Sequence, residues 1–299
     1  MNGHRSAQQD PDSGRRPAGL GELLDHWRDE LAGWAIPERI TADVTESPWV
    51  LPRQVFARRA DRLAAEPHGP SYRRAWAALD PPGSVLDVGA GAGAACIPLL
   101  DRTTALTAVD TDAGMLGLLA ERAGALAGRV ALVQGTWPEV AQDAAPADVV
   151  TCFNVVYNAP DILPFLAALT ASARRLVVVE LTAQHPLVSL NPLWLRFHGL
   201  ERPEGPTAGD LLDILAAMGF QASSEHWERP SAADYASFAE LTEVTTRRLC
   251  LPAARSGEVA QALLEAGADP DSPADLGTSR RDVVTIWWAG SAAGHDYQD

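Results

Sequence analysis

The sequence predicts an α/β fold with a mostly parallel, doubly wound sheet of about seven strands. Five short apolar runs lie between residues 84 and 181, and stretches with helical spacing separate them. Strands that alternate with helices form a parallel sheet through right-handed crossover connections. The runs are rich in valine, leucine and alanine and show little polar alternation, which is typical of strands buried on both faces.

The region before the first of these runs contains no convincing strand. Residues 1–18 are polar and rich in proline, glycine and serine, so we expect a disordered tail there. Apolar residues then recur at helical spacing in three segments, 20–34, 53–66 and 71–79. We therefore expect an N-terminal helical cap over residues 19–79.

The predicted sheet begins after Pro81-Pro82-Gly83. Its first five strands cover residues 84–89, 105–110, 130–135, 148–154 and 175–181. The helices between them are expected near 94–101, 112–127, 137–142 and 161–173. Beyond them we expect a helix at 207–218, a sixth strand at 220–229, helices at 231–250 and 256–267, and a last strand at 281–290.

These elements predict one α/β domain over residues 80–290. Two less regular segments, near 185–206 and 231–276, interrupt it. We expect them to be insertions that carry substrate specificity. A short tail, 291–299, follows the last strand.

The composition of the chain disfavours several kinds of binding partner and several protein classes. The formal net charge of −15 disfavours a protein that holds nucleic acid through its phosphates, because such a protein needs a basic face. The three cysteines are far apart and form no CxxC pair, which favours free thiols in a reducing cytosol over a disulfide framework or a zinc site. No apolar stretch approaches the roughly 18 residues of a membrane helix. We therefore expect a cytoplasmic protein without a metal centre, and the absence of lysine together with abundant alanine favours a bacterial source.

One stretch, "VLDVGAGAGAACIPLL" at residues 85–100, places an acid at the end of an apolar strand and directly before alternating glycines. In a dinucleotide fold such a loop holds a pyrophosphate, and Gly89-x-Gly91-x-x-Ala94 fits the relaxed pattern of that fold. A carboxylate at Asp87 would repel those phosphates. A ligand that carries a cation and no phosphate would be attracted to it instead, while the glycines let the backbone approach closely.

The stretch "VLDVGAGAG" resembles the first motif of the class I S-adenosylmethionine-dependent methyltransferases. In that motif an acid at the end of the first strand precedes three glycines at alternate positions, and Asp87, Gly89, Gly91 and Gly93 fill these positions. The resemblance implies that S-adenosylmethionine is the cofactor and that its methionine part lies at this loop. It also implies a class I methyltransferase-like sheet whose last strand is antiparallel.

The second strand also ends in an acid. Asp110 stands in "AVDTD", 23 residues after Asp87, and a carboxylate there can accept hydrogen bonds from both hydroxyls of a ribose. Because dinucleotide folds use the same device, Asp110 indicates a ribose and does not identify the cofactor. The resemblance implies that Thr111 and Met115 also contact the cofactor, with Met115 or Leu116 near the adenine.

The third and fourth motifs depart from the commonest family pattern. Where the family often has Gly-Asp, the sequence has Gly135-Thr136-Trp137. We expect this segment to meet the adenine edge, with Trp137 either stacking on the adenine or packing in the core. The fourth strand ends near Asn154, which the resemblance directs toward the cofactor. The Asn/Asp-Pro-Pro-Tyr/Phe tetrad of enzymes that methylate planar nitrogens is missing, which disfavours those substrates.

Three residues after the fourth and fifth strands are candidates for a catalytic role. Tyr157 is expected either to orient a substrate or to fill the pocket wall. His185 and His198 follow strand five, where the reacting groups should meet. Each is a candidate general base for a hydroxyl acceptor, with a structural role as the alternative.

Together these features predict methyl transfer from S-adenosylmethionine to a small-molecule acceptor, through in-line displacement by an O, N or C nucleophile. Two other classes stay open at this point. The relaxed glycine pattern favours an NAD(P)-dependent oxidoreductase, and a non-catalytic protein that binds S-adenosylmethionine and serves a partner is the second alternative. The acidic charge disfavours an RNA methyltransferase.

Overall fold

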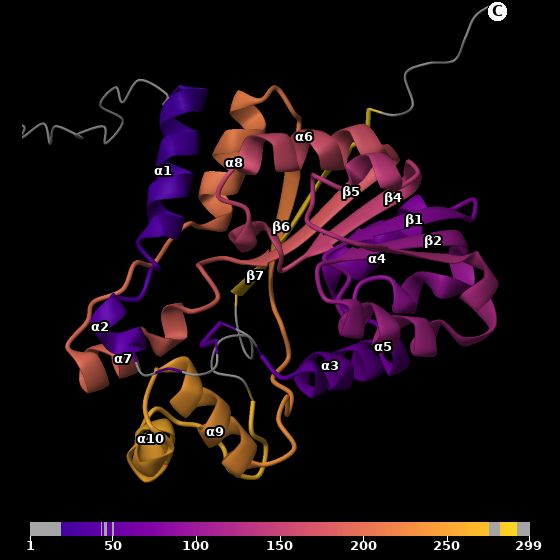
Figure 1. Ribbon diagram of the computed structural model, residues 1–299. Helices are drawn as coiled ribbons and strands as arrows, with labels where there is room; N and C mark the ends of the chain where they lie inside the picture. Colours follow the sequence, from indigo (N-terminus) through magenta and orange to yellow (C-terminus); the bar gives the residue numbers. More distant parts are fainter. Residues whose placement is uncertain (1–18, 43, 45–46, 50, 275–281, 292–299) are drawn as a thin grey trace, which may run out of the picture.

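The computed structural model describes residues 19–42, 44, 47–49, 51–274 and 282–291; the predicted tail 1–18 and residues 292–299 of the other tail lie outside them. The described strands form one sheet in the order β3-β2-β1-β4-β5-β7-β6 (Figure 1). They are β1 (Gly83–Val88), β2 (Thr103–Asp110), β3 (Val130–Gln134), β4 (Ala147–Phe153), β5 (Ala173–Thr182), β6 (Ser223–Glu228) and β7 (Asp282–Ala289). Strand β7 runs antiparallel to both of its neighbours, and the other neighbouring pairs are parallel. The predicted fold class is thereby confirmed.

The strand order determines where a ligand is expected. From β1 the chain moves outward through β2 to β3, and it then returns to β4 on the other side of β1. In open α/β sheets, ligands bind beyond the carboxyl ends of the strands at such a switch point. The carboxyl ends of β1 and β4 are therefore the expected place for the site.

Helices cover both faces of the sheet (Figure 1). One face packs against α1 (Leu20–Ala32), α6 (Ile162–Ser172) and α8 (Ala208–Ala217), and the other packs against α4 (Gly69–Ala78) and α5 (Ala113–Ala123). Within β1, Leu86 belongs to the first apolar cluster and Val85 to the second, and both are buried. Burial on both faces explains why the central strands β1, β4 and β5 lack polar alternation. The edge strand β3 was expected to be buried as well, but it is partly exposed, with Leu132 43% exposed.

The N-terminal helices are divided among three places. Helix α1 lies on one sheet face, where Trp27 is fully buried and donates a 2.9 Å hydrogen bond from Nε1 to the carbonyl of Ala159. Helix α4 covers the opposite face, while α2 (Glu38–Thr41) and α3 (Arg53–Ala65) lie beyond the sheet (Figure 1). The segment predicted as one N-terminal cap, 19–79, is divided because α1 and α4 bury their apolar stripes against different faces of the sheet.

A separate group of helices lies beyond the carboxyl end of β5. It comprises α2, α7 (Asn191–His198), α9 (Phe238–Arg248) and α10 (Ser256–Glu265), and we call it the helical cap (Figure 1). The apolar cluster of the cap is separate from the two clusters of the sheet and includes Leu193, Trp194, Leu241, Val259 and Leu263. Helices α7, α9 and α10 come from the two segments predicted as insertions.

Three predicted helices are shorter than expected. Residues 94–101 form turns and then the 3-10 helix Ile97–Arg102, which has Pro98 in its first turn. Residues 137–142 contain only the start of a short 3-10 helix, Ala141–Asp143. Helix α9 begins at Phe238 and not near residue 231, because the Ser237 side chain caps it by accepting a hydrogen bond from the Glu240 amide.

Candidate active site

Asp87 is the penultimate residue of β1 and is almost completely buried, with 1% of its surface exposed. Its Oδ1 atom accepts a 2.8 Å hydrogen bond from the hydroxyl of Thr151, the residue that faces it in register on β4. Its Oδ2 atom is buried and has no hydrogen-bond partner of ordinary geometry. Burial raises the pKa of the Asp87 carboxyl to about 6, while Cys96 and Thr151 act in the opposite direction. In the cofactor-free protein Oδ2 of Asp87 is therefore a buried acceptor without a well-formed hydrogen bond, and Cys96 is the neighbouring group that partly compensates for its burial.

The loop that follows, residues 89–93, contains three glycines with left-handed backbone angles; we call it the glycine loop. The φ angles are 71° at Gly89, 52° at Gly91 and 95° at Gly93. A Cβ atom at Gly89 would lie 2.2 Å from Cγ2 of Val155, and one at Gly93 would lie 2.5 Å from Cγ1 of Ile97. The packing of the loop against its own neighbours therefore requires the first and third glycines. A Cβ at Gly91 would meet only the Met115 methyl group, at 3.4 Å, so this glycine has the most open surroundings of the three.

Asp110, at the end of β2, is held against the glycine loop. Its Oδ2 atom accepts a 2.8 Å hydrogen bond from the amide of Gly91, and its Oδ1 atom accepts a 2.9 Å hydrogen bond from the amide of Asp112. A carboxylate has about four acceptor positions, so each oxygen can accept a second hydrogen bond. The two amides thus fix the orientation of a carboxylate that can still receive two ribose hydroxyls.

The start of α5 brings Met115 to the glycine loop. Asp112 caps this helix, because its carboxylate accepts hydrogen bonds from the amides of Gly114 and Met115. The Arg53 guanidinium donates two hydrogen bonds to the same carboxylate and holds the pKa of Asp112 below its usual range. Met115 is buried, whereas Thr111 is exposed and uses its carbonyl to accept a hydrogen bond from Gln134. Of these two predicted cofactor residues, Met115 contributes a side chain beside the loop.

The segment after β3 is divided between the site and the core. The Gly135 amide donates a 3.0 Å hydrogen bond to the Asp110 carbonyl, which ties the ends of β2 and β3 together. Thr136 is exposed. Trp137 is 6% exposed, belongs to the core cluster that includes α6, and donates from Nε1 to the carbonyl of Phe165 at 3.3 Å. Of the two roles considered for Trp137, the packing role is therefore observed, and stacking on adenine stays a prediction.

Asn154 follows β4 in a left-handed conformation, with φ of 61°. Its amide donates a 2.7 Å hydrogen bond to the carbonyl of Glu180 on β5, and the residue is exposed. Asparagine tolerates this conformation better than most residues, which lets the chain turn sharply at the strand end. This turn directs the next residue, Val155, onto Gly89.

Two of the three candidate catalytic residues lie together at the carboxyl end of β5. The rings of Tyr157 and His185 meet edge to face at 5.0 Å, and His185 also stacks on Trp34 at 4.0 Å. The Tyr157 hydroxyl donates a 2.6 Å hydrogen bond to the carbonyl of Thr182. His185 is 6% exposed, and its Nδ1 atom accepts a hydrogen bond from the Leu187 amide. Both side chains are therefore already engaged within the protein.

His198 lies elsewhere. It ends α7 in the helical cap, where its ring packs on Trp194 and its Nε2 atom lies 2.6 Å from the carbonyl of Leu249. A nitrogen that donates to a carbonyl cannot at the same time accept a proton from a substrate. Of the three candidates, His198 is the one that the fold does not bring to the strand ends.

Two further polar residues, Thr151 and Glu180, lie beside the site and were not predicted. Each has a sequence feature that indicates a role there. Thr151 is a polar residue inside the buried run of β4, which marks it as a partner for another buried polar group. Glu180 is an acid near the end of β5, in the same kind of position as Asp87 and Asp110. Its side chain is 11% exposed and accepts a 2.5 Å hydrogen bond from Arg229 at the end of β6.

The residues around the glycine loop fit S-adenosylmethionine. The buried Oδ2 atom of Asp87 lacks a donor, which the ammonium of the methionine part would supply, and Asp110 presents oriented acceptors for a ribose. Neither carboxylate suits a pyrophosphate. Among the described residues, no group of three or more His, Cys, Asp or Glu side chains could hold a metal ion, and none of the described helices is long and apolar enough to cross a bilayer.

Comparison with known families identifies a domain in the part of the chain that contains the glycine loop. Residues 85–176, which span β1 to the middle of β5, match the family model described as "Methyltransferase domain". No curated protein sequence matches the chain.

Several solved structures have a similar fold. The YcgJ protein from Bacillus subtilis is 17% identical, with a TM-score of 0.50, and the alignment covers 75% of this chain and 99% of that one. A putative sarcosine dimethylglycine methyltransferase from Galdieria sulphuraria is 12% identical, with a TM-score of 0.49, over 88% and 99% of the two chains. Magnesium protoporphyrin IX methyltransferase from Synechocystis, with bound SAH, is 15% identical, with a TM-score of 0.47, over 91% and 99%. Residues 85–176 therefore match a methyltransferase domain, and the strand order together with the two strand-end acids supports S-adenosylmethionine as its cofactor.

Proposed function

We propose that this methyltransferase acts on a small-molecule acceptor that binds between the carboxyl ends of β4 and β5 and the helical cap. The observation that carries the proposal is the aromatic cluster of Trp34, Tyr157 and His185 at the end of β5, which lies between the sheet and the segment leading into the cap. An apolar, aromatic wall of this kind is typical of sites for small organic molecules. The net charge of −15 disfavours a nucleic acid in the same place.

The cofactor end of the site has a role for each strand-end acid. When bound, S-adenosylmethionine supplies a methyl group on a positively charged sulfur, which is already an activated leaving group. Asp87 would bind the ammonium through its unpartnered Oδ2 atom, and Asp110 would bind the ribose. Met115 would pack against the adenine end. The other proposed cofactor contacts are Thr111, Gly135, Thr136, Trp137 and Asn154.

At the acceptor end of the site, the protein needs to align the acceptor with the methyl group more than it needs a residue for proton transfer. The Tyr157 hydroxyl is committed to the Thr182 carbonyl, and His185 accepts a backbone hydrogen bond at Nδ1. We therefore assign these two residues to the wall that positions the acceptor and excludes water. In an in-line displacement this positioning supplies much of the rate enhancement.

The closing test uses methyl-labelled S-adenosylmethionine and cell extract. After incubation with the protein, the label is measured separately in small-molecule, RNA and protein fractions, with the Asp110→Asn variant as the matched control. The proposal expects label in the small-molecule fraction with the natural protein and a strong loss of it with the variant. Label that appears in the RNA or protein fraction would contradict the small-molecule acceptor. Cofactor binding without labelling of any fraction would favour the non-catalytic alternative.

A further inference from the structure

Helix α3 lies between the cofactor half of the site and the helical cap. It has three faces, and each of them contacts a different neighbour. Residues three or four apart share one face of a helix. Arg53, Ala57 and Asp61 form the face toward α5, and Phe56 and Ala60 form an apolar face. Arg58, Arg59 and Arg62 form the third face, toward the segment that leads into α9.

The apolar face of α3 lies on the glycine loop. Ala60 is fully buried and forms one cluster with Ala92 of the loop and with Met115, and Phe56 packs against this cluster. Ala92 stands between Gly91 and Gly93, and Met115 is the side chain nearest to Gly91. Helix α3 therefore contacts the same residues that the cofactor is expected to contact.

Ion pairs attach α3 to α5. Arg53 donates from Nε and Nη2 to the two carboxylate oxygens of Asp112, at 3.0 and 2.8 Å. Arg122 donates in the same two-pronged way to Asp61, at 2.7 and 3.1 Å. The Asp61 carboxylate and the Arg53 guanidinium are largely exposed. The Arg53–Asp112 and Arg122–Asp61 ion pairs therefore each contribute little stability by themselves.

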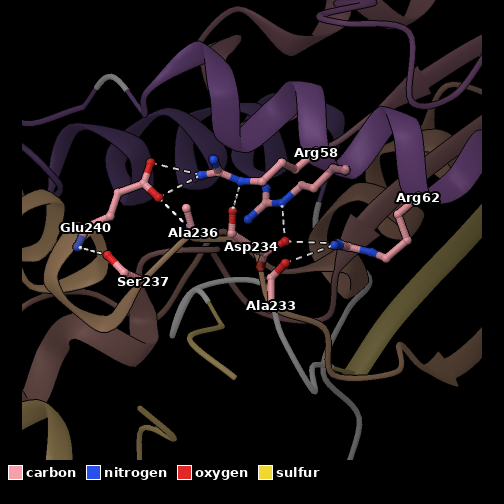
Figure 2. Close-up of polar contacts among 8 residues, drawn as sticks. Arg58, Arg62, Ala233, Asp234, Ala236, Ser237 and Glu240 are labelled. Carbon is pink, nitrogen blue, oxygen red and sulfur yellow. Dashed lines mark hydrogen bonds and ion pairs between the residues drawn. The ribbon is translucent and has the colours of Figure 1, made fainter. Parts of the chain in front are cut away.

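The attachment to the cap is more deeply buried: Val55 of α3 belongs to the apolar cluster of the cap, and the polar part of the attachment centres on Asp234 (Figure 2). The Asp234 side chain is 3% exposed, and its Oδ1 atom accepts hydrogen bonds from Arg59 at 2.9 Å and from Arg62 at 3.0 Å. Its carbonyl accepts a third, at 2.7 Å, from Arg58. Asp234 thus accepts hydrogen bonds from the three arginines on this face of α3.

Glu240 completes this cluster. It accepts two 2.9 Å hydrogen bonds from Arg58 and one from the amide of Ala236, which holds the turn before α9 against α3 (Figure 2). Loss of the Asp234 charge would remove the anion that Arg59 and Arg62 share.

We propose that Asp234 is a positioning residue for cofactor binding: it holds α3 over the glycine loop and thereby slows the escape of S-adenosylmethionine. The proposal rests on the cofactor assignment above. A cofactor seated at the glycine loop lies beneath the apolar face of α3. When the buried attachment of α3 is weakened, the helix leaves this position more often and the cofactor dissociates faster.

The test compares Asp234→Asn with Glu258→Gln. Asparagine keeps the size of the side chain and removes its charge; Glu258 pairs with Arg255 on the outer surface of the cap and serves as the matched control. We expect Asp234→Asn to raise the dissociation rate of S-adenosylmethionine roughly tenfold, as for a modest coupling between two elements, and to raise amide exchange within 53–65. Glu258→Gln should change neither. A dissociation rate within twofold of that of the natural protein, or exchange raised throughout the sheet, would overturn the proposal.

A second variant keeps the test decisive if Asp234→Asn fails to fold. Arg62→Gln removes one of the three arginines and leaves Arg58 and Arg59 in place, so we expect a smaller increase in the dissociation rate with exchange again confined to α3. An unchanged rate would contradict the proposal. The Asp110→Asn variant separates this result from the cofactor assignment: if it binds S-adenosylmethionine normally, the assignment has failed and not the role of Asp234.

Discussion

The Thr151 hydroxyl donates a 2.8 Å hydrogen bond across the β1–β4 pair to Oδ1 of Asp87, and the other oxygen of that carboxylate is buried without a partner. A buried charged group with an unfilled hydrogen-bonding position destabilises the protein that contains it. A ligand cation removes this cost when it binds. The state of the Asp87 carboxylate should therefore affect three properties: the stability of the cofactor-free protein, the pH dependence of that stability, and the affinity for the cofactor.

Stability of the cofactor-free protein should fall as the pH rises from about 4 to about 7. Burial raises the pKa of the Asp87 carboxyl from its ordinary value of 3.8 to about 6. In this range the unfolded chain has released the proton that the folded protein still binds, so the free energy of unfolding decreases with pH. The Asp87→Asn variant should lose this contribution and be more stable above pH 6, by up to about 3 kcal/mol. Denaturant titrations at several pH values measure both curves, and parallel curves would contradict the prediction.

The ionisation of Asp87 should also set the pH dependence of cofactor affinity. Affinity should rise with pH, whereas the stability of the cofactor-free protein falls. An ammonium is attracted to the ionised carboxylate, so protonation of Asp87 competes with binding. We expect the affinity for S-adenosylmethionine to decrease below about pH 6, and Asp87→Asn to bind weakly at all pH values. Calorimetric titration measures this dependence. An affinity that stays flat in the natural protein would show that Asp87 does not face the cation.

Asp110→Asn should weaken cofactor binding by roughly ten- to a hundredfold, since hydrogen bonds to charged groups contribute about 1.5–3 kcal/mol each. The Gly91 amide can still donate to the remaining amide oxygen, so the fold should be retained. Asp101→Asn is the control, because Asp101 is exposed at the opposite end of β2. Equal affinities of the two variants would remove Asp110 from the cofactor site.

Two glycine substitutions should have opposite effects on stability. Gly89→Ala forces a left-handed alanine whose Cβ would overlap Val155, and we expect a loss of about 2–4 kcal/mol. Gly117→Ala, inside α5, meets no atom within 4 Å and should gain about 1 kcal/mol. Thermal or denaturant unfolding of the pair measures both. A tolerated Gly89→Ala would mean that the glycine loop is looser than its packing indicates.

Tyr157→Phe separates the wall role from a catalytic one. Removal of the hydroxyl leaves the Thr182 carbonyl without its donor, so we expect a loss of about 1 kcal/mol of stability with unchanged cofactor affinity. Once an acceptor has been identified, the variant should keep most of its turnover. A drop in turnover of more than tenfold at normal stability would assign the hydroxyl to the chemistry.

The sequence by itself determined where the strands lie along the chain and which loop is expected to hold the cofactor. Both signals are local: apolar runs buried on two faces, and an acid followed by glycines at alternate positions. Because parallel strands bring their carboxyl ends to one edge of the sheet, the two strand-end acids could be placed near each other without coordinates. The fit of Asp87 and Asp110 to the glycine loop follows from that topology.

Only the tertiary structure decided which side chains beyond this loop face the site. Trp137 and His198 occupy helix and loop positions whose direction depends on distant packing partners, α6 for the first and the helical cap for the second. The place of α3 could not be predicted either, because its amphipathic pattern indicates a buried face and not the partner of that face. That partner is set by residues such as Asp234, which lies more than 170 positions further along the chain and meets α3 only after the fold has formed.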